Sequence, residues 1–357
     1  WSPWDYLWLF NFDYYELCLD VLYIYNKKKI MAQIIKKPLL TIAIPTYNNH
    51  KYLLEQLNRL RLQITDEVYI YIIDNNSLPS VEDYLKNNGF DTNNWRIYKH
   101  DTNIVPDLNI YKCITLSETD WTWVLSDNDL IEQNVISNVL HLIKEKNDSF
   151  FINFGYLKDF EGRGLKDFCL MASYVNSFAI SNCIYNMSYL KSQLPIYKES
   201  IKTHQGQLVF ILNYLALNKN AKFVLSQIKI FNESLTPQWP KSTFLVDSIG
   251  FFEFVPETVR IYIKNSRIGK RILGMQIILL SISRAFEKKS FKKTFFIFKD
   301  IIKESSVKQI FSLQFFKSLF YLMISMVFPN VYRSNSKRLF NKSFEPKVDK
   351  NMSDFFK

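Results

Sequence analysis

Short apolar runs rich in β-branched residues alternate with amphipathic stretches from residue 38 onward, and this alternation limits the possible folds more than any other feature. Strands separated by helical crossovers are typical of an α/β domain with a largely parallel sheet. The predicted strands span 39–45, 67–74, 95–100, 121–126, 150–157 and 221–226. The predicted helices span 49–62, 80–87, 105–117 and a stretch after Thr203, and a loop is predicted around Gly162 and Gly164.

Three of the predicted strands end in polar clusters. PTYN follows the first strand at 45–48, DNNS follows the second at 74–77, and SDND follows the fourth at 126–129. Parallel strands bring their carboxyl ends to one edge of a sheet, and the ligands of open α/β sheets bind outside that edge. The sequence therefore predicts a ligand site there.

Asp127 and Asp129 are the strongest local signal in these clusters. Residues i and i+2 of an extended segment point the same way, so both carboxylates can converge on one hard cation. Such an ion suits a nucleotide diphosphate, whose oxygens complete its coordination. The alternative is a solvated loop in which Asp129 caps an apolar helix that follows immediately.

Asp74 ends an apolar strand, where a buried carboxylate needs hydrogen-bond donors. The base or ribose of a nucleotide offers such donors. The alternative is that Asp74 caps the following turn, an interpretation that Asn75 fits equally well. In the PTYN cluster, Tyr47 can instead pack against the fold and Asn48 can cap the next helix.

Four motifs follow one another along the chain: TIAIPTYN at 41–48, IYIIDNNS at 70–77, NIVPDLN at 103–109 and SDND at 126–129. Together they resemble the nucleotide-sugar domain of family 2 glycosyltransferases, which have the GT-A fold. The similarity covers roughly residues 38–135 and fades over 150–230. It implies a Rossmann-like, mixed and mostly parallel sheet flanked by helices. The spacing is most similar to the bacterial branch of abequosyltransferases, which build surface polysaccharides.

The resemblance also implies roles for individual residues. Asp127 would face the ribose or the diphosphate and share a divalent metal with Asp129, the direct ligand of Mg²⁺ or Mn²⁺. That metal would neutralise charge on the departing nucleotide diphosphate. The positions that match the family's nucleotide-sugar site are Pro45, Thr46, Tyr47, Asn48, Asp74, Asn75, Asn103, Asn109 and Asp127.

Three features depart from the family pattern. Val105 stands where Gly is usual, so the backbone there cannot enter positive φ freely and the edge of the site can differ. Asn128 replaces the more usual central Asp and removes one negative charge. The Glu-Asp pair that often supplies the general base of inverting members is not visible.

Inverting transfer needs a base that takes the proton from an acceptor hydroxyl. We favour His204, because Thr203 is expected to cap a helix whose apolar stripe begins at this histidine. The abequosyltransferase-like branch has a similarly placed histidine. Glu199 is the second candidate, and Asp159 and Glu161 are weaker ones, all on predicted loops. The alternative is that His204 is a capped structural residue.

The positive charge of the chain belongs to its C-terminal part. The whole chain carries +11, whereas residues 260–342 hold eighteen Lys or Arg against three Asp or Glu, a net of 18 − 3 = +15. The helical segment 291–304 can lie in an anionic membrane interface, with lysines beside its apolar face. The alternative is a helical subdomain that packs this face against the catalytic domain. The apolar face consists of Phe291, Phe295, Phe298 and Ile302, and the lysines beside it are Lys292, Lys299 and Lys303.

These patterns predict three parts of the chain. Residues 1–37 form a leader, and residues 1–30 are interpreted as an upstream extension because the chain begins with Trp and Met31 precedes the patterned part. Residues 38–245 form the GT-A domain, and residues 246–357 form a basic, amphipathic helical region.

The resemblance implies a metal-dependent, inverting glycosyltransferase that moves one sugar from a nucleotide-diphospho-sugar to a saccharide acceptor, commonly lipid-linked. Lipopolysaccharide, lipooligosaccharide or capsule biosynthesis would be its setting. The Gln-x-x-Arg-Trp signature of processive synthases is absent from the sequence, which favours single-sugar addition. The sequence shows neither a spanning apolar run nor a secretory signal. We therefore expect a cytoplasmic enzyme, peripheral on the inner face of the cytoplasmic membrane.

Other observations bear on this expectation and on its rivals. Four cysteines, at 18, 113, 169 and 183, lack metal-ligand spacing and are expected to be reduced and mostly buried. A nucleotidyltransferase would show a glycine- and basic-rich loop after the first strand, which the PTYNNH segment lacks. A nucleic-acid-binding protein is suggested by the sequence pI of about 9.2. Because the charge gathers in one aromatic-rich segment, we expect an anionic membrane surface as its partner and no nucleic acid.

Overall fold

The computed structural model describes most of the residues between 38 and 265 and fewer beyond them. The described residues are 38–92, 95–172, 177, 179–231, 253–265, 277, 294–295, 298–299, 301–302, 305, 310 and 313–327. The predicted leader over 1–37 and the predicted boundary near residue 245 lie outside them. Within them, Cys113, Cys169 and Cys183 are buried, as expected from the sequence.

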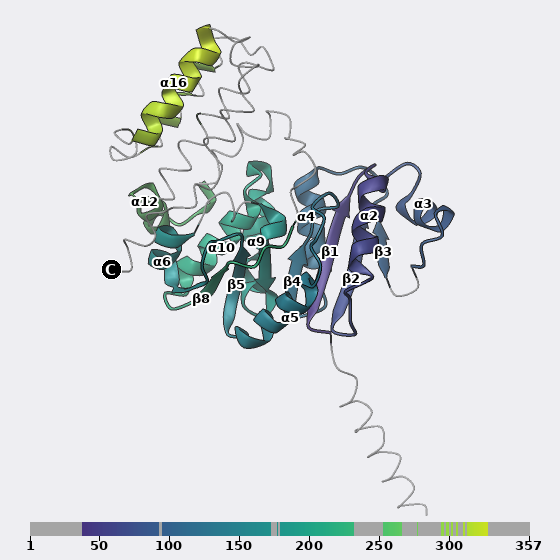
Figure 1. The fold of residues 1–357 in the computed structure, drawn as a ribbon. Helices are drawn as coiled ribbons and strands as arrows, with labels where there is room; N and C mark the ends of the chain where they lie inside the picture. Colours follow the sequence, from purple (N-terminus) through teal and green to yellow (C-terminus); the bar gives the residue numbers. More distant parts are fainter. Residues whose placement is uncertain are drawn as a thin grey trace, which may run out of the picture.

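An eight-stranded mixed sheet, in the order β3-β2-β1-β4-β7-β5-β8-β6, forms the centre of the fold (Figure 1). Strands β3, β2, β1 and β4 are mutually parallel, and β5 is parallel to β8, whereas β7 and β6 pair antiparallel with their neighbours. The predicted α/β class with a mixed, mostly parallel sheet is confirmed. The strands are β1 (Leu40–Thr46), β2 (Val68–Asp74), β3 (Arg96–Lys99), β4 (Trp121–Val124), β5 (Ser149–Phe154), β6 (Phe160–Arg163), β7 (Cys183–Asn186) and β8 (Lys222–Ser226).

Helices connect the strands and cover the sheet. The first three predicted helices are present as α2, α3 and α4, each within a few residues of the predicted bounds. The described α-helices are α2 (His50–Leu60), α3 (Val81–Asn87), α4 (Pro106–Thr115), α5 (Val135–Glu145), α6 (Gly164–Met171), α8 (Met187–Leu190), α9 (Leu194–Ser200), α10 (Gly206–Leu217), α12 (Glu257–Asn265) and α16 (Leu313–Val327). Three short 3₁₀ helices are η1 (Ile180–Asn182), η2 (Lys191–Gln193) and η3 (Ile201–Thr203).

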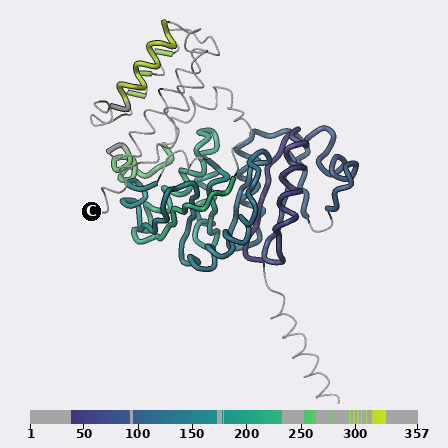
Figure 2. The backbone as a smooth tube through the Cα atoms, in the orientation of Figure 1, coloured from purple at the N-terminus to yellow at the C-terminus, as the bar shows by residue number. Residues whose placement is uncertain are grey.

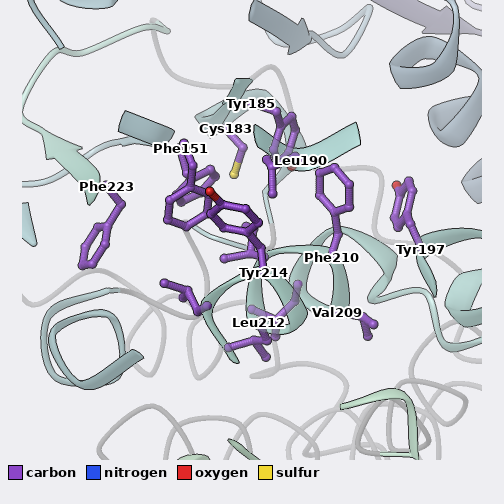
Figure 3. Close-up of a cluster of buried hydrophobic side chains, with 14 of the residues drawn as sticks. Phe151, Cys183, Tyr185, Leu190, Tyr197, Val209, Phe210, Leu212, Tyr214 and Phe223 are labelled. Atoms are coloured by element: carbon purple, nitrogen blue, oxygen red, sulfur yellow. The ribbon is translucent and has the colours of Figure 1, made fainter. Parts of the chain in front are cut away.

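The sheet separates two hydrophobic layers, because successive side chains of a strand point to opposite faces. On one face, Ile42 and Ile44 of β1 pack with apolar residues of α2, α3 and α5. On the other face, Ala43 joins the layer formed with α4, α6, α9 and α10. Figure 3 shows part of this second layer, in which Tyr185 of β7 lies near Phe210 of α10 with ring centroids 5.8 Å apart.

The predicted loop around Gly162 and Gly164 is wrong. Residues Phe160–Arg163 form edge strand β6, and Gly164 begins α6. A Cβ atom at Gly162 would lie 2.1 Å from the ring of Phe223, and Gly164 has a φ of +64° against the carbonyl of Lys219. Glycine here allows close packing and a left-handed backbone rather than an irregular segment.

The described residues of the C-terminal region form a hydrophobic cluster of their own. Phe298 and Ile302, two members of the predicted apolar face, are partly buried against it, whereas Phe295 is 52% exposed. That part of the face packs, as the subdomain alternative supposed. Its packing partners, however, are other C-terminal residues and not the catalytic domain. The buried members of the cluster are Ile277, Ile301, Phe315 and Leu322.

Figure 2 traces the chain from β1 in purple to α16 in yellow. Among the helices of the described residues, none has the combined length and apolarity that crossing a membrane requires. The predictions for Phe291, Lys292 and Lys303 fall on positions outside the described residues.

We predict that Leu57→Ala and Leu62→Ala differ sharply in stability although they lie five residues apart. Leu57 of α2 is 0% exposed, so its truncation should cost about 2–5 kcal/mol of unfolding free energy. Leu62 is 81% exposed, and its truncation should cost less than about 0.5 kcal/mol. Urea denaturation of both variants checks this, and equal losses would contradict the described packing of α2.

Candidate active site

The parallel register of β1 brings three polar strand ends together. Thr46 pairs with Asp74 of β2, and Ala43 pairs with Val124 of β4. Thr46 and Asp127 each follow that second pair by three residues, so they reach the same level at the carboxyl edge of the sheet. The Thr46 hydroxyl donates to Oδ2 of Asp127 at 2.6 Å. The edge predicted from the sequence therefore exists as a connected polar cluster.

Asp127 is a buried carboxylate supported by neutral donors. Its side chain accepts from Thr46 and also from Nδ2 of Asn49, which lies 2.9 Å from Oδ1. Burial raises the pKa of Asp127 to about 6, although these two hydrogen bonds oppose the shift. The nearby charge of Asp129 raises it further. The site holds negative charge that a bound cation would stabilise.

Asp129 is held by two distant parts of the chain. The hydroxyl of Ser181, in η1, donates to its Oδ2 at 2.7 Å, and the amide of Gln56, in α2, donates to its backbone carbonyl at 2.8 Å. Burial also raises the pKa of Asp129. No helix follows immediately, because α5 begins only at Val135 with Asn134 at its N-cap. The helix-capping alternative for Asp129 is therefore wrong.

The two carboxylates fit a hard divalent cation in their chemistry. Oδ1 of Asp129 accepts no hydrogen bond from the residues that the structure describes, so it offers an oxygen ligand beside Asp127. Within the same residues, no three His, Cys, Asp or Glu side chains gather as a metal-binding group. A cation here would take its remaining ligands from phosphate oxygens or water, as Mg²⁺ commonly does.

Asp74 and Asn48 both hold the turn that follows β2. The Asp74 carboxylate accepts from the backbone N–H groups of Ser77 and Val81, which fits the capping alternative. Asn48 adopts a φ of 51° and accepts from the N–H of Leu78, so it does not cap α2 as the alternative for this residue supposed. A role of Asp74 toward a nucleotide stays a prediction.

Tyr47 and Pro45 lie at the end of β1, next to this polar cluster. The Tyr47 side chain is 47% exposed, so it does not pack into the fold as its structural alternative supposed. Pro45 pairs with Ile73 of β2 in the sheet. The placement leaves the Tyr47 ring at the surface beside the strand ends that hold Asp74 and Asp127.

Asparagines anchor the segment that leads into α4. Nδ2 of Asn75 donates to Oδ1 of Asn103 and to the carbonyl of Ile104, and Nδ2 of Asn109 donates to the carbonyl of Ile73. These bonds hold the start of α4 against the end of β2. Val105 has a φ of −60°, so the position needs no glycine in this chain.

His204 lies beside the start of α4, but not on the predicted helix. Thr203 ends η3, Gln205 is the N-cap residue, and α10 begins at Gly206. The predicted cap at Thr203 is wrong because its hydroxyl donates to the carbonyl of Ser200 and accepts from the N–H of Gln205. His204 itself has a φ of 55°.

The imidazole of His204 pairs with the carboxylate of Asp107, the second residue of α4. Its Nδ1 lies 2.6 Å from Oδ2 of Asp107, a residue that is only 6% exposed. The carboxylate accepts from Nδ1–H, so a neutral His204 carries its lone pair on Nε2. This pair connects the turn between η3 and α10 to the motif over 103–109.

The other candidate bases, Glu199, Glu161 and Asp159, do not contact the polar cluster at the strand ends in the hydrogen bonds and ion pairs of the described residues. Glu199 is exposed in helix α9, and Glu161 lies in β6 and forms an ion pair with Lys146, so neither is on the predicted loop. Asp159 accepts from the side chains of Ser226 and Gln227. Among the contacts of the described residues, His204 is the candidate that meets one of the four sequence motifs, through Asp107.

Four site residues were not predicted from the sequence. Asn49 and Asp107 adjoin or lie within the motifs, and their polar side chains were the available signal. Gln56 and Ser181 lie outside any motif, so only the fold reveals that they hold the Asp129 segment.

Residues 41–168 match the family model described as Glycosyl transferase family 2. This segment resembles a family 2 glycosyltransferase domain. The match contains the strand ends of the polar cluster, including Asp127 and Asp129, and it includes Asp107. A search of the curated proteins finds no match to the chain.

Solved structures place the family 2 domain in a known architecture. The structure of residues 1–349 of Staphylococcus aureus TarS has a TM-score of 0.52 and 16% identity, with 83% of this chain and 92% of that chain covered. The full S. aureus TarS structure has a TM-score of 0.51 and 15% identity, covering 82% of this chain and 55% of that one. At this identity the likeness concerns the fold alone, which is GT-A-like.

We predict that Asp127→Asn stabilises the protein at neutral pH in the absence of divalent cations. Folding raises the pKa of Asp127 from 3.8 to about 6, so the folded protein binds this proton more tightly than the unfolded chain. The stability gained from binding this proton is complete below pH 4 and is lost as the pH rises through 6. Asn removes the charge, and its carbonyl oxygen can still accept from Nδ2 of Asn49 while its amide group donates to the Thr46 hydroxyl in a reversed hydrogen bond.

The unfolding free energy of the Asp127→Asn variant should exceed that of the wild type by up to about 3 kcal/mol at pH 7.5. This difference should disappear near pH 4. Urea denaturation at the two pH values measures this. Asp66→Asn, at an exposed turn before β2, is the matched control and should change little at either pH. A stability gain that is equal at both pH values would contradict the assignment.

Proposed function

We propose that the protein is a metal-dependent, inverting glycosyltransferase that moves one sugar from a nucleotide-diphospho-sugar to a saccharide acceptor. The carrying observation is the contact between Thr46 and Asp127 at the carboxyl edge of the parallel strands, inside the family 2 domain, with Asp129 two residues on. Ligands of open α/β sheets bind at this edge. The carboxylates there carry raised pKa values, which a divalent cation would oppose.

The donor's diphosphate is proposed to bind at Asp127 and Asp129 together with Mg²⁺ or Mn²⁺. When bound, the cation supplies Lewis-acid stabilisation of negative charge on the leaving diphosphate. Ser181 and Gln56 keep the Asp129 segment in place, and Asn49 and Thr46 orient Asp127. These bonds fix the carboxylate oxygens before a donor arrives, so little reorganisation is needed on binding.

The nucleoside part of the donor is proposed to lie over the ends of β1 and β2. The exposed Tyr47 ring and the neighbouring Asp74 and Asn75 stand there, as the family resemblance implies for Pro45 to Asn48 and for Asn103 and Asn109. Asp74 already accepts two backbone bonds. Each carboxylate oxygen has a second lone pair, so a base or ribose donor can still be accepted.

His204 is proposed as the general base, with Glu199 as the second candidate. Asp107 fixes the imidazole through Nδ1 and so assigns the proton-accepting lone pair to Nε2. A left-handed backbone at a non-glycine residue costs about 1–3 kcal/mol, and such strain gathers at functional sites. The Asp107 contact and the φ of 55° together favour a positioned histidine over a solvated one.

The acceptor and the location are proposed from the resemblance and from the charge distribution. A lipid-linked saccharide of lipopolysaccharide, lipooligosaccharide or capsule, extended by an abequosyltransferase-like enzyme, would lie on the inner face of the cytoplasmic membrane. The domain division at residue 245 and the basic region over 246–357 fit this arrangement. The proposed donor site contains acidic residues and lies outside this basic region. The positive charge of residues 246–357 therefore needs a partner other than the donor.

We predict that a nucleoside diphosphate raises the melting temperature only together with Mn²⁺. UDP, CDP, GDP and dTDP are each measured with Mn²⁺ and with EDTA by thermal shift. A ligand at 100 times its Kd adds about 2.7 kcal/mol of stability, a rise of several degrees. Asp129→Ala should lose this rise while keeping its own melting transition.

Asp66→Ala is the matched control, because it removes an exposed aspartate from the turn before β2 and should keep the full rise. Retention of the Mn²⁺-dependent rise in Asp129→Ala would refute the metal assignment. Absence of a rise with all four nucleotides would refute the proposed donor class.

We further predict that His204→Gln and Asp107→Asn preserve the nucleotide-dependent thermal shift but slow sugar transfer. Loss of a positioned base costs about 10²–10⁴-fold in rate. Transfer of radiolabelled sugar, from the donor that the panel identifies, into the lipid fraction of bacterial membranes measures it. Glu199→Gln serves as the comparison. Loss of transfer in Glu199→Gln alone would move the base assignment to that residue.

A further inference from the structure

Helix α16 exposes a continuous apolar stripe. Phe316, Phe320, Met323 and Val327 are 51%, 55%, 51% and 65% exposed. Their spacing of four, three and four residues places them on one face of an α-helix. Isolated exposed apolar residues are common, but four along one helical face mark an interaction surface. We call these four residues the α16 stripe.

The opposite face of α16 is already packed. Phe315 and Leu322 are 5% and 2% exposed in the C-terminal hydrophobic cluster, and Ser318 and Ser325 of the same helix are fully buried. The helix therefore uses one apolar face to fold against its own region. The α16 stripe is a second apolar face, and folding of the described residues does not account for it.

The sequence interval that contains α16 carries charges of one sign. Between Glu304 and Glu345 the sequence contains no acidic residue. A second copy of the chain would add a second interval of the same charge sign, and like charges brought together cost energy. Nucleic-acid phosphates would pair with the basic side chains and bases could stack on the phenylalanine rings, but Met323 and Val327 would be left without a partner. An anionic lipid surface satisfies both the basic side chains and the α16 stripe. The basic residues of this interval are Lys308, Lys317, Arg333, Lys337, Arg338 and Lys342.

We propose that α16 inserts its stripe into the interface of an anionic bilayer, parallel to the membrane plane. Its 15 described residues rise about 22 Å, less than the roughly 30 Å of the hydrocarbon core. Amphipathic helices bind such interfaces through apolar burial together with attraction to anionic headgroups. The inference extends the proposed function, on which it rests for its biological purpose, while its evidence is separate from the donor site.

Flotation of the full chain with vesicles tests the proposal. Vesicles of phosphatidylcholine alone are compared with vesicles that also contain phosphatidylglycerol. The wild type should float with the anionic vesicles and much less with the neutral ones. The double variant Phe316→Ser, Phe320→Ser should bind the anionic vesicles at least about tenfold less, because two large apolar groups no longer enter the interface. A second variant, Met323→Ser with Val327→Ser, tests the other end of the stripe.

Leu62→Ser with Leu217→Ser is the matched control, since these leucines are 81% and 71% exposed on the catalytic part of the chain. It should float like the wild type. Wild-type binding in both stripe variants, or no flotation of the wild type, would overturn the proposal. So would light scattering that shows a dimer which the stripe variants convert to a monomer.

Nucleotide thermal shifts on the same preparations separate the two proposals. A stripe variant that keeps its Mn²⁺-dependent shift is folded, so its loss of flotation reports the membrane surface alone. A wild type that floats but shows no nucleotide shift would refute the donor site and leave the α16 surface standing.

Discussion

The parallel pairing of β1 with both β2 and β4 is the constraint on which the site depends. It sets Thr46 opposite Asp74 and sets Ala43 opposite Val124, so that the chain beyond each strand leaves the sheet at one level. Slipping either pairing by one residue would reverse the faces of every side chain in that strand. Because both faces of β1 are buried in hydrophobic layers, the register is strongly specified. The contact of Thr46 with Asp127 follows from it.

Burial of two carboxylates in one place works against folding and prepares the site for a cation. Neutral donors hold Asp127 and Asp129, and no described lysine or arginine forms an ion pair with either. The charge is therefore positioned without being neutralised, and its cost appears as the raised pKa of each group. A protein can afford such a local cost when the surrounding sheet and its two hydrophobic layers are well packed.

Local patterns predicted most of the sheet but little of the support around the site. Six of the eight strands, all but β6 and β7, and the first three helices were predicted because their hydrophobic periodicity is strong and their turns are rich in Asn, Ser and Pro. The loop around Gly162 was wrong because glycine there serves close packing beneath Phe223. The cap at Thr203 was wrong because its hydroxyl bonds within η3, a tertiary outcome that capping preferences do not contain.

The sequence alone determined the α/β class, the order of the motifs and the pair Asp127 and Asp129, because these depend on short-range periodicity and on residue type. It also determined the basic charge of the C-terminal region, which is a matter of counting. Only the tertiary structure decided that Asp107 meets His204 and that Ser181 meets Asp129. Those partners are 97 and 52 residues apart, and contacts at such separations are set by strand register and helix packing.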